Sequence, residues 1–211
     1  MASTVLKTEN AGFRVVLLGV DQLKPHEKGS PLYLELLRKE IIKDGMLKYP
    51  IIADETSYVI LDGMHRWLVL KSLGYELVPV ILVNVFQNQK IRIGKRRVQR
   101  YASVIDKEIP VRQVISAGVT GQLMEPRTTR HFFPFSKFQE INCPLHSLRR
   151  NVPEDVSRYL SKMSDEECSL AMEQWLEEMC EELEFLSKRI AEVEKEKREF
   201  LDRVKSLAVG L

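Results

Sequence analysis

The sequence has few cysteines and no long apolar run. Its three cysteines, Cys143, Cys168 and Cys180, include no Cys-x-x-Cys pair. An odd number without paired spacing argues against a disulfide framework and a zinc site, so we expect reduced thiols in a cytoplasmic protein. No apolar stretch reaches the roughly 18 residues that a membrane helix needs, and no signal-peptide pattern opens the chain. We therefore expect no membrane partner.

The chain also lacks a strong overall charge, but its charges are unevenly distributed. The formal net charge is only +2, yet residues 1–150 hold 23 Lys and Arg against 14 Asp and Glu, whereas residues 151–211 hold 9 against 16. This asymmetry favours anion binding by the first segment. Two solvated surfaces of opposite sign are the alternative interpretation.

Alternating strand and helix patterns predict an α/β (α+β) domain over residues 12–140. The predicted helices cover 31–44, 67–73 and 107–117, and Pro31 and Gly45 suit the start and end of the first. Pro79 places the last strand at a sheet edge or near its own start. Residues 118–134 are expected to be mostly loop. The predicted strands, of which the second and third can pair as a hairpin, cover 13–18, 49–53, 58–61 and 78–83.

Residues 153–211 are predicted to form a long helical tail. Apolar residues recur there in alternating steps of three and four, which is the heptad pattern of a coiled coil. We call this set the apolar seam: Leu176, Met179, Leu183, Leu186, Ile190, Val193, Phe200, Val204 and Leu207. A helix with such a seam either pairs in a coiled coil, which would give a homodimer or a hairpin, or packs on its own domain.

The segment from Leu61 to Trp67 combines a strand end, a glycine turn and a helix start. Free backbone N–H groups at a helix N-terminus bind phosphate. Arg66 adds a bidentate donor and His65 an imidazole. Asp62 could hold Mg²⁺ together with phosphate oxygens. The alternative is that Asp62 only caps the helix and Arg66 only lies on the surface.

A second polar cluster spans residues 126–131. It holds two arginines, two threonines and a histidine with no acid among them, downstream of Gly118 and Gly121; its donors are Arg127, Thr128, Thr129, Arg130 and His131. Such a set suits an oxyanion, and a solvated polar loop is the alternative.

The turn containing His26 and Glu27 follows the first strand. A lone carboxylate in a loop is usually solvated, but Glu27 could act as a general base if the fold placed it opposite the phosphate donors.

A basic stretch covers residues 90–100. Its cations could face nucleic acid phosphates, but we favour the solvent face of an element whose apolar positions point inward. The cations are Lys90, Arg92, Lys95, Arg96, Arg97 and Arg100.

Taken together, these motifs resemble the ParB/sulfiredoxin superfamily. The resemblance runs from Leu23-Lys24-Pro25-His26-Glu27, through Tyr49-Pro50-Ile51-Ile52, to Leu61-Asp62-Gly63-Met64-His65-Arg66, and covers roughly residues 13–135. Residues 126–131, Pro-Arg-Thr-Thr-Arg-His, are similar to an element of the ParB-like free L-serine kinases. That branch usually reads Asp-Gly-His-His-Arg, and here Met64 replaces the first histidine.

The resemblance implies a kinase that uses ADP or ATP, with Mg²⁺, to convert L-serine to O-phosphoserine. Glu27 would be the base that activates the serine hydroxyl, and Asp62 would position the metal or substrate. The resemblance implies that the nucleotide phosphates are held by Gly63, His65 and Arg66, joined by Thr128, Thr129, Arg130 and His131. The alternative hypothesis is a ParB-like protein without enzymatic activity that binds nucleotide or DNA and dimerises through its tail; nucleic acid is the less favoured partner.

Overall fold

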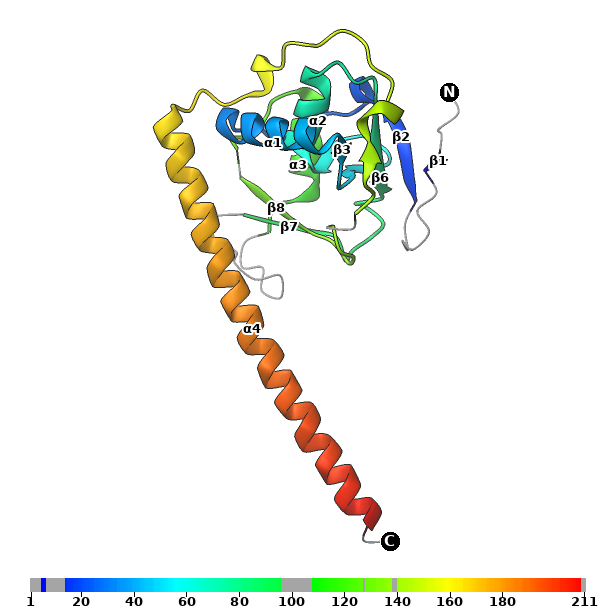
Figure 1. Ribbon diagram of the computed structural model, residues 1–211, viewed down its shortest axis with the longest axis vertical. Helices are drawn as coiled ribbons and strands as arrows, with labels where there is room; N and C mark the ends of the chain where they lie inside the picture. Colours follow the sequence, from blue (N-terminus) through cyan, green and yellow to red (C-terminus); the bar gives the residue numbers. More distant parts are fainter. Residues whose placement is uncertain (1–4, 7–13, 96–107, 127, 138–139, 210–211) are drawn as a thin grey trace. The chain divides into compact units, whose positions relative to one another are not determined.

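The computed structural model describes residues 5–6, 14–95, 108–126, 128–137 and 140–209. The chain divides into two compact units, Met1–Cys168 and Ser169–Leu211. The first unit is a mixed α/β fold, as predicted (Figure 1). Three short 3₁₀ turns, Val20–Gln22, Leu145–Ser147 and Ser157–Tyr159, connect its regular elements.

A five-stranded sheet forms the centre of the first unit, in the order β1-β2-β6-β4-β5. The predicted hairpin is confirmed, because β4 and β5 pair antiparallel with Ile52 opposite Asp62. Strands β4 and β6 run parallel. The strands are β1 (Val5–Leu6), β2 (Val15–Gly19), β4 (Ile51–Asp54), β5 (Ile60–Asp62) and β6 (Leu77–Val83).

Pro79 predicted that β6 lies at a sheet edge or that the proline lies near the start of the strand. Strand β6 is in the middle of the sheet, so the first of these predictions is wrong. Pro79 is its third residue and lies opposite Leu17 of β2. The parallel ladder with β4 begins one residue later, at Val80. The missing N–H of Pro79 therefore falls near the start of the strand, which was the other expectation.

Three helices belong to the α/β part of the first unit. Helix α1 (Pro31–Asp44) has the predicted bounds: the Ser30 hydroxyl accepts a hydrogen bond from the N–H of Tyr33, and Gly45 ends the helix at φ 64°. Helix α2 (Met64–Ser72) begins three residues earlier than predicted. Helix α3 (Val111–Thr120) follows Pro110 and is shifted toward the C-terminus relative to the predicted 107–117.

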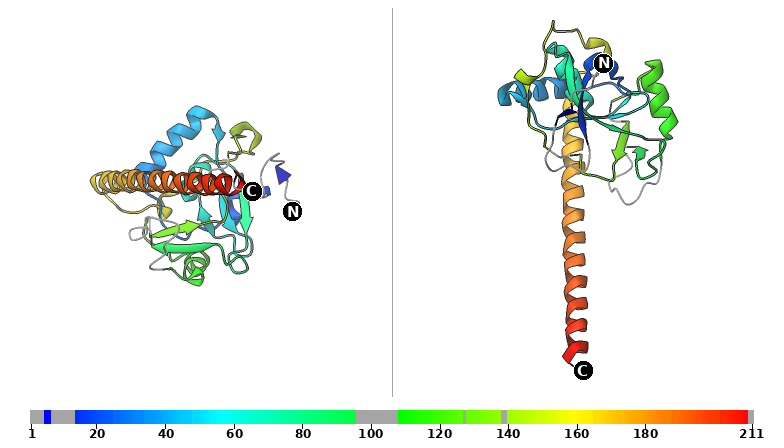
Figure 2. Two further views of the ribbon diagram at one scale, coloured as in Figure 1. Left: turned by 90° about the horizontal axis from the view of Figure 1, so that it is seen from below. Right: turned by 90° about the vertical axis from the view of Figure 1, so that its right-hand side faces the viewer.

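The helices cover both faces of the sheet, and α1 and α3 lie on opposite sides of it (Figure 2). Alternate residues of β2 point to opposite faces, as expected for a strand. Val16 joins the core cluster that contains residues of α1 and α2. Val15 joins the cluster that contains Val114 of α3. Both faces of the sheet are therefore buried.

Two further pairs of strands flank the sheet. Strand β7 (Arg92–Lys95) pairs antiparallel with β8 (Thr129–Phe132), and β3 (Met46–Leu47) pairs with β9 (Cys143–Pro144). The expectation that residues 118–134 form mostly loop is confirmed for the described residues, although α3 extends to Thr120 and Thr129–Phe132 form the unpredicted strand β8. Backbone pairing with β7 fixes β8, and that partner lies 34 or more residues earlier in the sequence.

The C-terminal part of the chain is the single helix α4 (Asp165–Val209), 45 residues long. The described side chains of the apolar seam are 45–61% exposed, from Val204 to Phe200. Cys143 is buried and Cys180 is exposed, and both are free thiols. Among the described helices, none is long and apolar enough to cross a membrane.

Candidate active site

The start of α2 has the geometry that the sequence predicts for an anion site. Strand β5 ends at Asp62, and Gly63 turns the chain at φ 91° into Met64, the first residue of α2. A Cβ atom at Gly63 would lie 2.9 Å from two guanidinium nitrogens of Arg66, so any side chain there would displace the arginine. The first N–H groups of a helix have no partner within the helix and can bind an anion.

Asp62 is not the capping residue of this helix, because Gly63 occupies the N-cap position. Its carboxylate is instead held between two cations. Arg66 donates through Nη2 to Oδ2 at 2.5 Å, and Lys137 donates through Nζ to Oδ1 at 3.2 Å. Burial would raise the pKa of Asp62, but Arg66 and Lys137 outweigh it and hold that pKa below its ordinary value.

Lys137 is a site residue that the sequence analysis missed. It follows β8 by five positions, and its side chain is 35% exposed. Only the fold brings it to Asp62, 75 residues away in the sequence. A single lysine between aromatic residues carries no motif, so no sequence signal distinguished it from a surface residue.

His65 faces the backbone of α1. Its Nε2 accepts a hydrogen bond from the N–H of Ser30 at 2.8 Å, and its ring lies edge-on to Tyr33. In the neutral ring an accepting Nε2 leaves the proton on Nδ1. His65 therefore ties the starts of α1 and α2 together, while its predicted contact with phosphate stays a prediction.

Met64 occupies the hydrophobic core. Its side chain is only 7% exposed and belongs to the cluster that contains Leu34, Trp67 and Leu68. The side chain at this position therefore serves packing in this chain.

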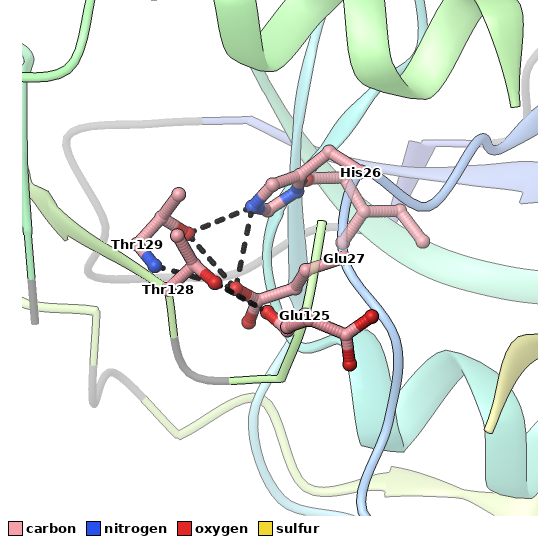
Figure 3. Close-up of polar contacts among 6 residues, drawn as sticks. His26, Glu27, Glu125, Thr128 and Thr129 are labelled. Atoms are coloured by element: carbon pink, nitrogen blue, oxygen red, sulfur yellow. Dashed lines mark hydrogen bonds and ion pairs between the residues drawn. The ribbon is translucent and has the colours of Figure 1, made fainter. Parts of the chain in front are cut away.

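His26, Glu27 and Thr129 form a connected hydrogen-bonded group (Figure 3). The Thr129 hydroxyl lies 2.8 Å from Nε2 of His26 and 3.2 Å from Oε2 of Glu27. Its backbone N–H also donates to Glu27, at 3.4 Å. Nδ1 of His26 lies 2.6 Å from the carbonyl oxygen of Ile60. Burial lowers the pKa of His26 to about 4, although the bond to Ile60 raises it.

The second polar cluster lies largely on β8, where its side chains point in different directions. The Thr128 hydroxyl donates to the carbonyl oxygen of Glu125 at 2.6 Å, and the Arg130 guanidinium stacks over Phe132 at 5.4 Å. Thr129 and His131 are buried. Arg127 lies outside the described residues.

His131 connects the two motifs. Its ring lies edge-on to that of His26 at 5.2 Å, and its Nε2 is buried with no hydrogen-bond partner among the described residues. Burial, followed by repulsion from His26, lowers its pKa well below the ordinary value despite attraction to Asp62. The start of α2, β8 and the His26-Glu27 turn therefore converge on one region.

A cavity of about 220 Å³ adjoins this region. It is lined by residues of β8 and the segment that follows it: Arg130, His131, Phe132, Phe133, Phe135, Ser136 and Lys137. The rings of Phe133 and Phe135 stack at 5.3 Å. The cavity thus presents two cations beside aromatic surface, a combination that suits an aromatic anion such as a nucleotide.

The glycines upstream of the cluster do not contribute to it. Gly118 lies within α3, where a Cβ atom would come within 2.6 Å of Val59, and Gly121 ends that helix. The basic stretch includes β7, which pairs with β8 along its length. Ile91 and Ile93 are buried there while Lys90 is exposed, as the solvent-face interpretation requires. Arg96, Arg97 and Arg100 lie outside the described residues.

A resident metal has little support from protein ligands alone. In the part of the chain that the structure describes, no three His, Cys, Asp or Glu side chains cluster as a metal site. Asp62 is the one carboxylate at the turn, and cations engage both its oxygens. This donor set fits Mg²⁺ only if phosphate oxygens and water complete the coordination, which is how Mg²⁺ commonly binds in kinases.

Comparison with known proteins confirms the resemblance. No family model matches the chain. It is 39% identical over 82 residues to an ATP-dependent L-serine kinase from Staphylothermus marinus. The aligned segment covers 36% of this chain and 32% of the relative. The chain is also 30% identical over 77 residues to an ADP-dependent L-serine kinase from Thermococcus kodakarensis. This alignment covers 35% of the chain and 32% of the relative.

A third relative is a ParB-like protein from Sulfolobus acidocaldarius, 34% identical over 88 residues, which is 40% of this chain and 43% of the relative. The chain thus spans less than half the length of each of these curated relatives.

Solved structures show the same fold. A free serine kinase in complex with AMP aligns with a TM-score of 0.54 at 16% identity, covering 64% of this chain and 93% of that one. A variant of a free serine kinase in complex with ADP aligns with a TM-score of 0.55 at 16% identity, covering 64% and 94%. The first unit is therefore similar in fold to these free serine kinases.

Proposed function

We propose that this protein is a nucleotide-dependent kinase that phosphorylates free L-serine to O-phosphoserine. The observation that carries the proposal is the convergence of Asp62 and Arg66, the buried residues of β8, and Glu27. Carboxylates, cations and a helix N-terminus lie in this region, and these are groups that phosphoryl transfer can use. The names of the similar proteins support L-serine as the acceptor and either ADP or ATP as the donor.

In this mechanism Glu27 receives the proton of the serine hydroxyl. The serine oxygen then forms a bond to the terminal phosphorus of the nucleotide, and the bond from that phosphorus to the bridging oxygen breaks. The bridging oxygen keeps the electron pair. The N–H groups at Gly63 and the start of α2, together with Arg66, would hold the phosphates during this displacement.

Lys137 and the residues of β8 would complete the phosphate site. Lys137 is 35% exposed and its ammonium group binds Asp62, so a small movement of the side chain would bring it to a phosphate. Asp62 would then be available to Mg²⁺ arriving with the nucleotide, and the ion would neutralise phosphate charge there. Thr128, which directly precedes β8, and Arg130 within it are partly exposed and would contact the same phosphates. Arg127 and His131 are assigned to this site on the sequence motif.

The test is direct. Purified protein is incubated with L-serine, MgCl₂ and either ADP or ATP, and O-phosphoserine is measured by mass spectrometry. We expect product with at least one donor. Nucleotide binding without product from either donor would contradict the proposal and favour the non-enzymatic ParB-like alternative. Salt-resistant, sequence-specific DNA binding would then support that alternative.

We propose in addition that the apolar seam of α4 pairs with its counterpart in a second copy as a coiled coil. The support is the heptad spacing together with the exposure of Leu183, Ile190 and Phe200. Sedimentation equilibrium of the full chain should give twice the chain mass of 24.5 kDa. Ile190→Glu should give the monomer, and a monomeric parent chain would contradict the pairing. A cytoplasmic location stays a prediction of the sequence.

A further inference from the structure

We infer that His26 and Thr129 are positioning residues that form a directional hydrogen-bond relay and strengthen Glu27 as a base. The inference rests on the proposed function, because it concerns the group that takes the proton from serine. Neither His26 nor Thr129 is required to touch the substrate. Their effect would act through the carboxylate of Glu27 alone.

The direction of the relay follows from its buried end. The carbonyl oxygen of Ile60 can only accept, so Nδ1 of His26, 2.6 Å away, must carry a proton. His26 is 3% exposed, and burial keeps its ring neutral at neutral pH. A neutral ring with its proton on Nδ1 has an accepting Nε2. The Thr129 hydroxyl, 2.8 Å away, is therefore the donor to His26.

This direction leaves the Thr129 oxygen as an acceptor toward Glu27. A hydroxyl has one proton, and that proton is directed at His26. The Thr129 hydroxyl can donate to Oε2 of Glu27, 3.2 Å away, only by giving up its bond to His26. While Glu27 is ionised, His26 and Glu27 compete for the single hydroxyl proton. Protonation of Glu27 therefore adds one hydrogen bond and completes the chain from Glu27 to Ile60.

Other charged groups near the relay leave this reasoning intact. Nε2 of His26 lies 3.9 Å from Oε2 of Glu27. His131 faces His26 from β8, and its lowered pKa keeps that ring neutral as well. The carboxylate of Glu125 is bound to Lys28 at 2.8 Å, so this pair is internally balanced. Arg127 lies outside the described residues, and its charge would be the same in every variant used below.

The experiment compares pH–rate profiles of the full-length protein and its variants. Activity that needs ionised Glu27 falls as the pH drops, which defines an acid limb in kcat. Thr129→Val keeps the shape of the side chain but removes the hydroxyl. We expect its acid limb to move by about 0.5–1 pH unit to lower pH, the size of one net hydrogen bond. Its plateau kcat should fall several-fold while the KM for serine stays similar.

Two further variants separate the relay from a structural effect. Thr129→Ser keeps the hydroxyl and should restore the acid limb of the parent protein. Thr128→Val removes the neighbouring hydroxyl, which donates to Glu125, and should leave the acid limb in place whatever it does to nucleotide affinity. An unmoved limb in Thr129→Val, with a working parent enzyme, would overturn the relay. A parent enzyme without activity would instead overturn the proposed function.

A second measurement does not depend on activity or on the folding of a variant. The ¹⁵N chemical shifts of the His26 ring report its tautomer in the parent protein. We expect a protonated Nδ1 and an unprotonated Nε2 near neutral pH. A proton on Nε2 would reverse the donor at Thr129 and rule out the relay.

Discussion

Glu27→Gln tests the proposed role of Glu27 as the general base. Glutamine has the size of glutamate, but it cannot take a proton from the serine hydroxyl. Its amide oxygen can still accept from the backbone N–H of Thr129, which is 3.4 Å from Oε2. The local structure should therefore persist. General-base catalysis typically contributes about 10²–10⁴-fold, so we expect kcat to fall by about that factor.

The assay is single-turnover formation of O-phosphoserine, with nucleotide affinity measured in parallel by calorimetry. We expect nucleotide affinity to change less than about threefold, since Glu27 is assigned to the serine and not to the phosphates. Thr129→Ser is a control of similar burial that keeps every polar group. A Glu27→Gln protein that retains the parent kcat would refute the assignment of Glu27 as the base. Loss of nucleotide affinity with unchanged kcat would place Glu27 among the binding residues instead.

Three further changes test the rest of the site. Lys137→Met should weaken nucleotide binding about 5- to 30-fold by calorimetry, because it removes one of two cations beside Asp62; unchanged affinity would contradict its role. Gly63→Ala should lower the free energy of unfolding by about 1–2 kcal/mol, because an alanine is strained in the left-handed backbone conformation of this position. It should also lower nucleotide affinity, because the added Cβ atom would displace Arg66. Met64→His would bury an imidazole in the core, so the melting temperature should fall by about 2–8 °C; a large gain in phosphoserine formation would contradict the packing role of Met64.

Local chemistry made several features predictable from the sequence. Ser30, Pro31 and Gly45 carry the signals that begin and end a helix, and α1 has the predicted bounds. The strand end, glycine and cations from Asp62 to Arg66 were recognisable for the same reason. In each case, neighbours in the sequence supply the physical cause.

Features that depend on distant pairing could not be predicted in this way. Strand β8 is fixed by β7, and Lys137 reaches Asp62 only through the fold. The burial of Met64 depends on core neighbours from α1 and α2. The roles of His26 and Thr129 likewise arise from a bond between residues 103 positions apart.

That separation has a consequence for synthesis of the protein. Glu27 is made early, but its partner Thr129 lies 102 residues further on, and Lys137 comes later still. A nascent chain that has emerged only through α2 holds the glycine turn and the carboxylate but lacks the other half of the site. Most of the first unit must therefore leave the ribosome before the proposed site can form, and a fragment ending before β8 should be inert.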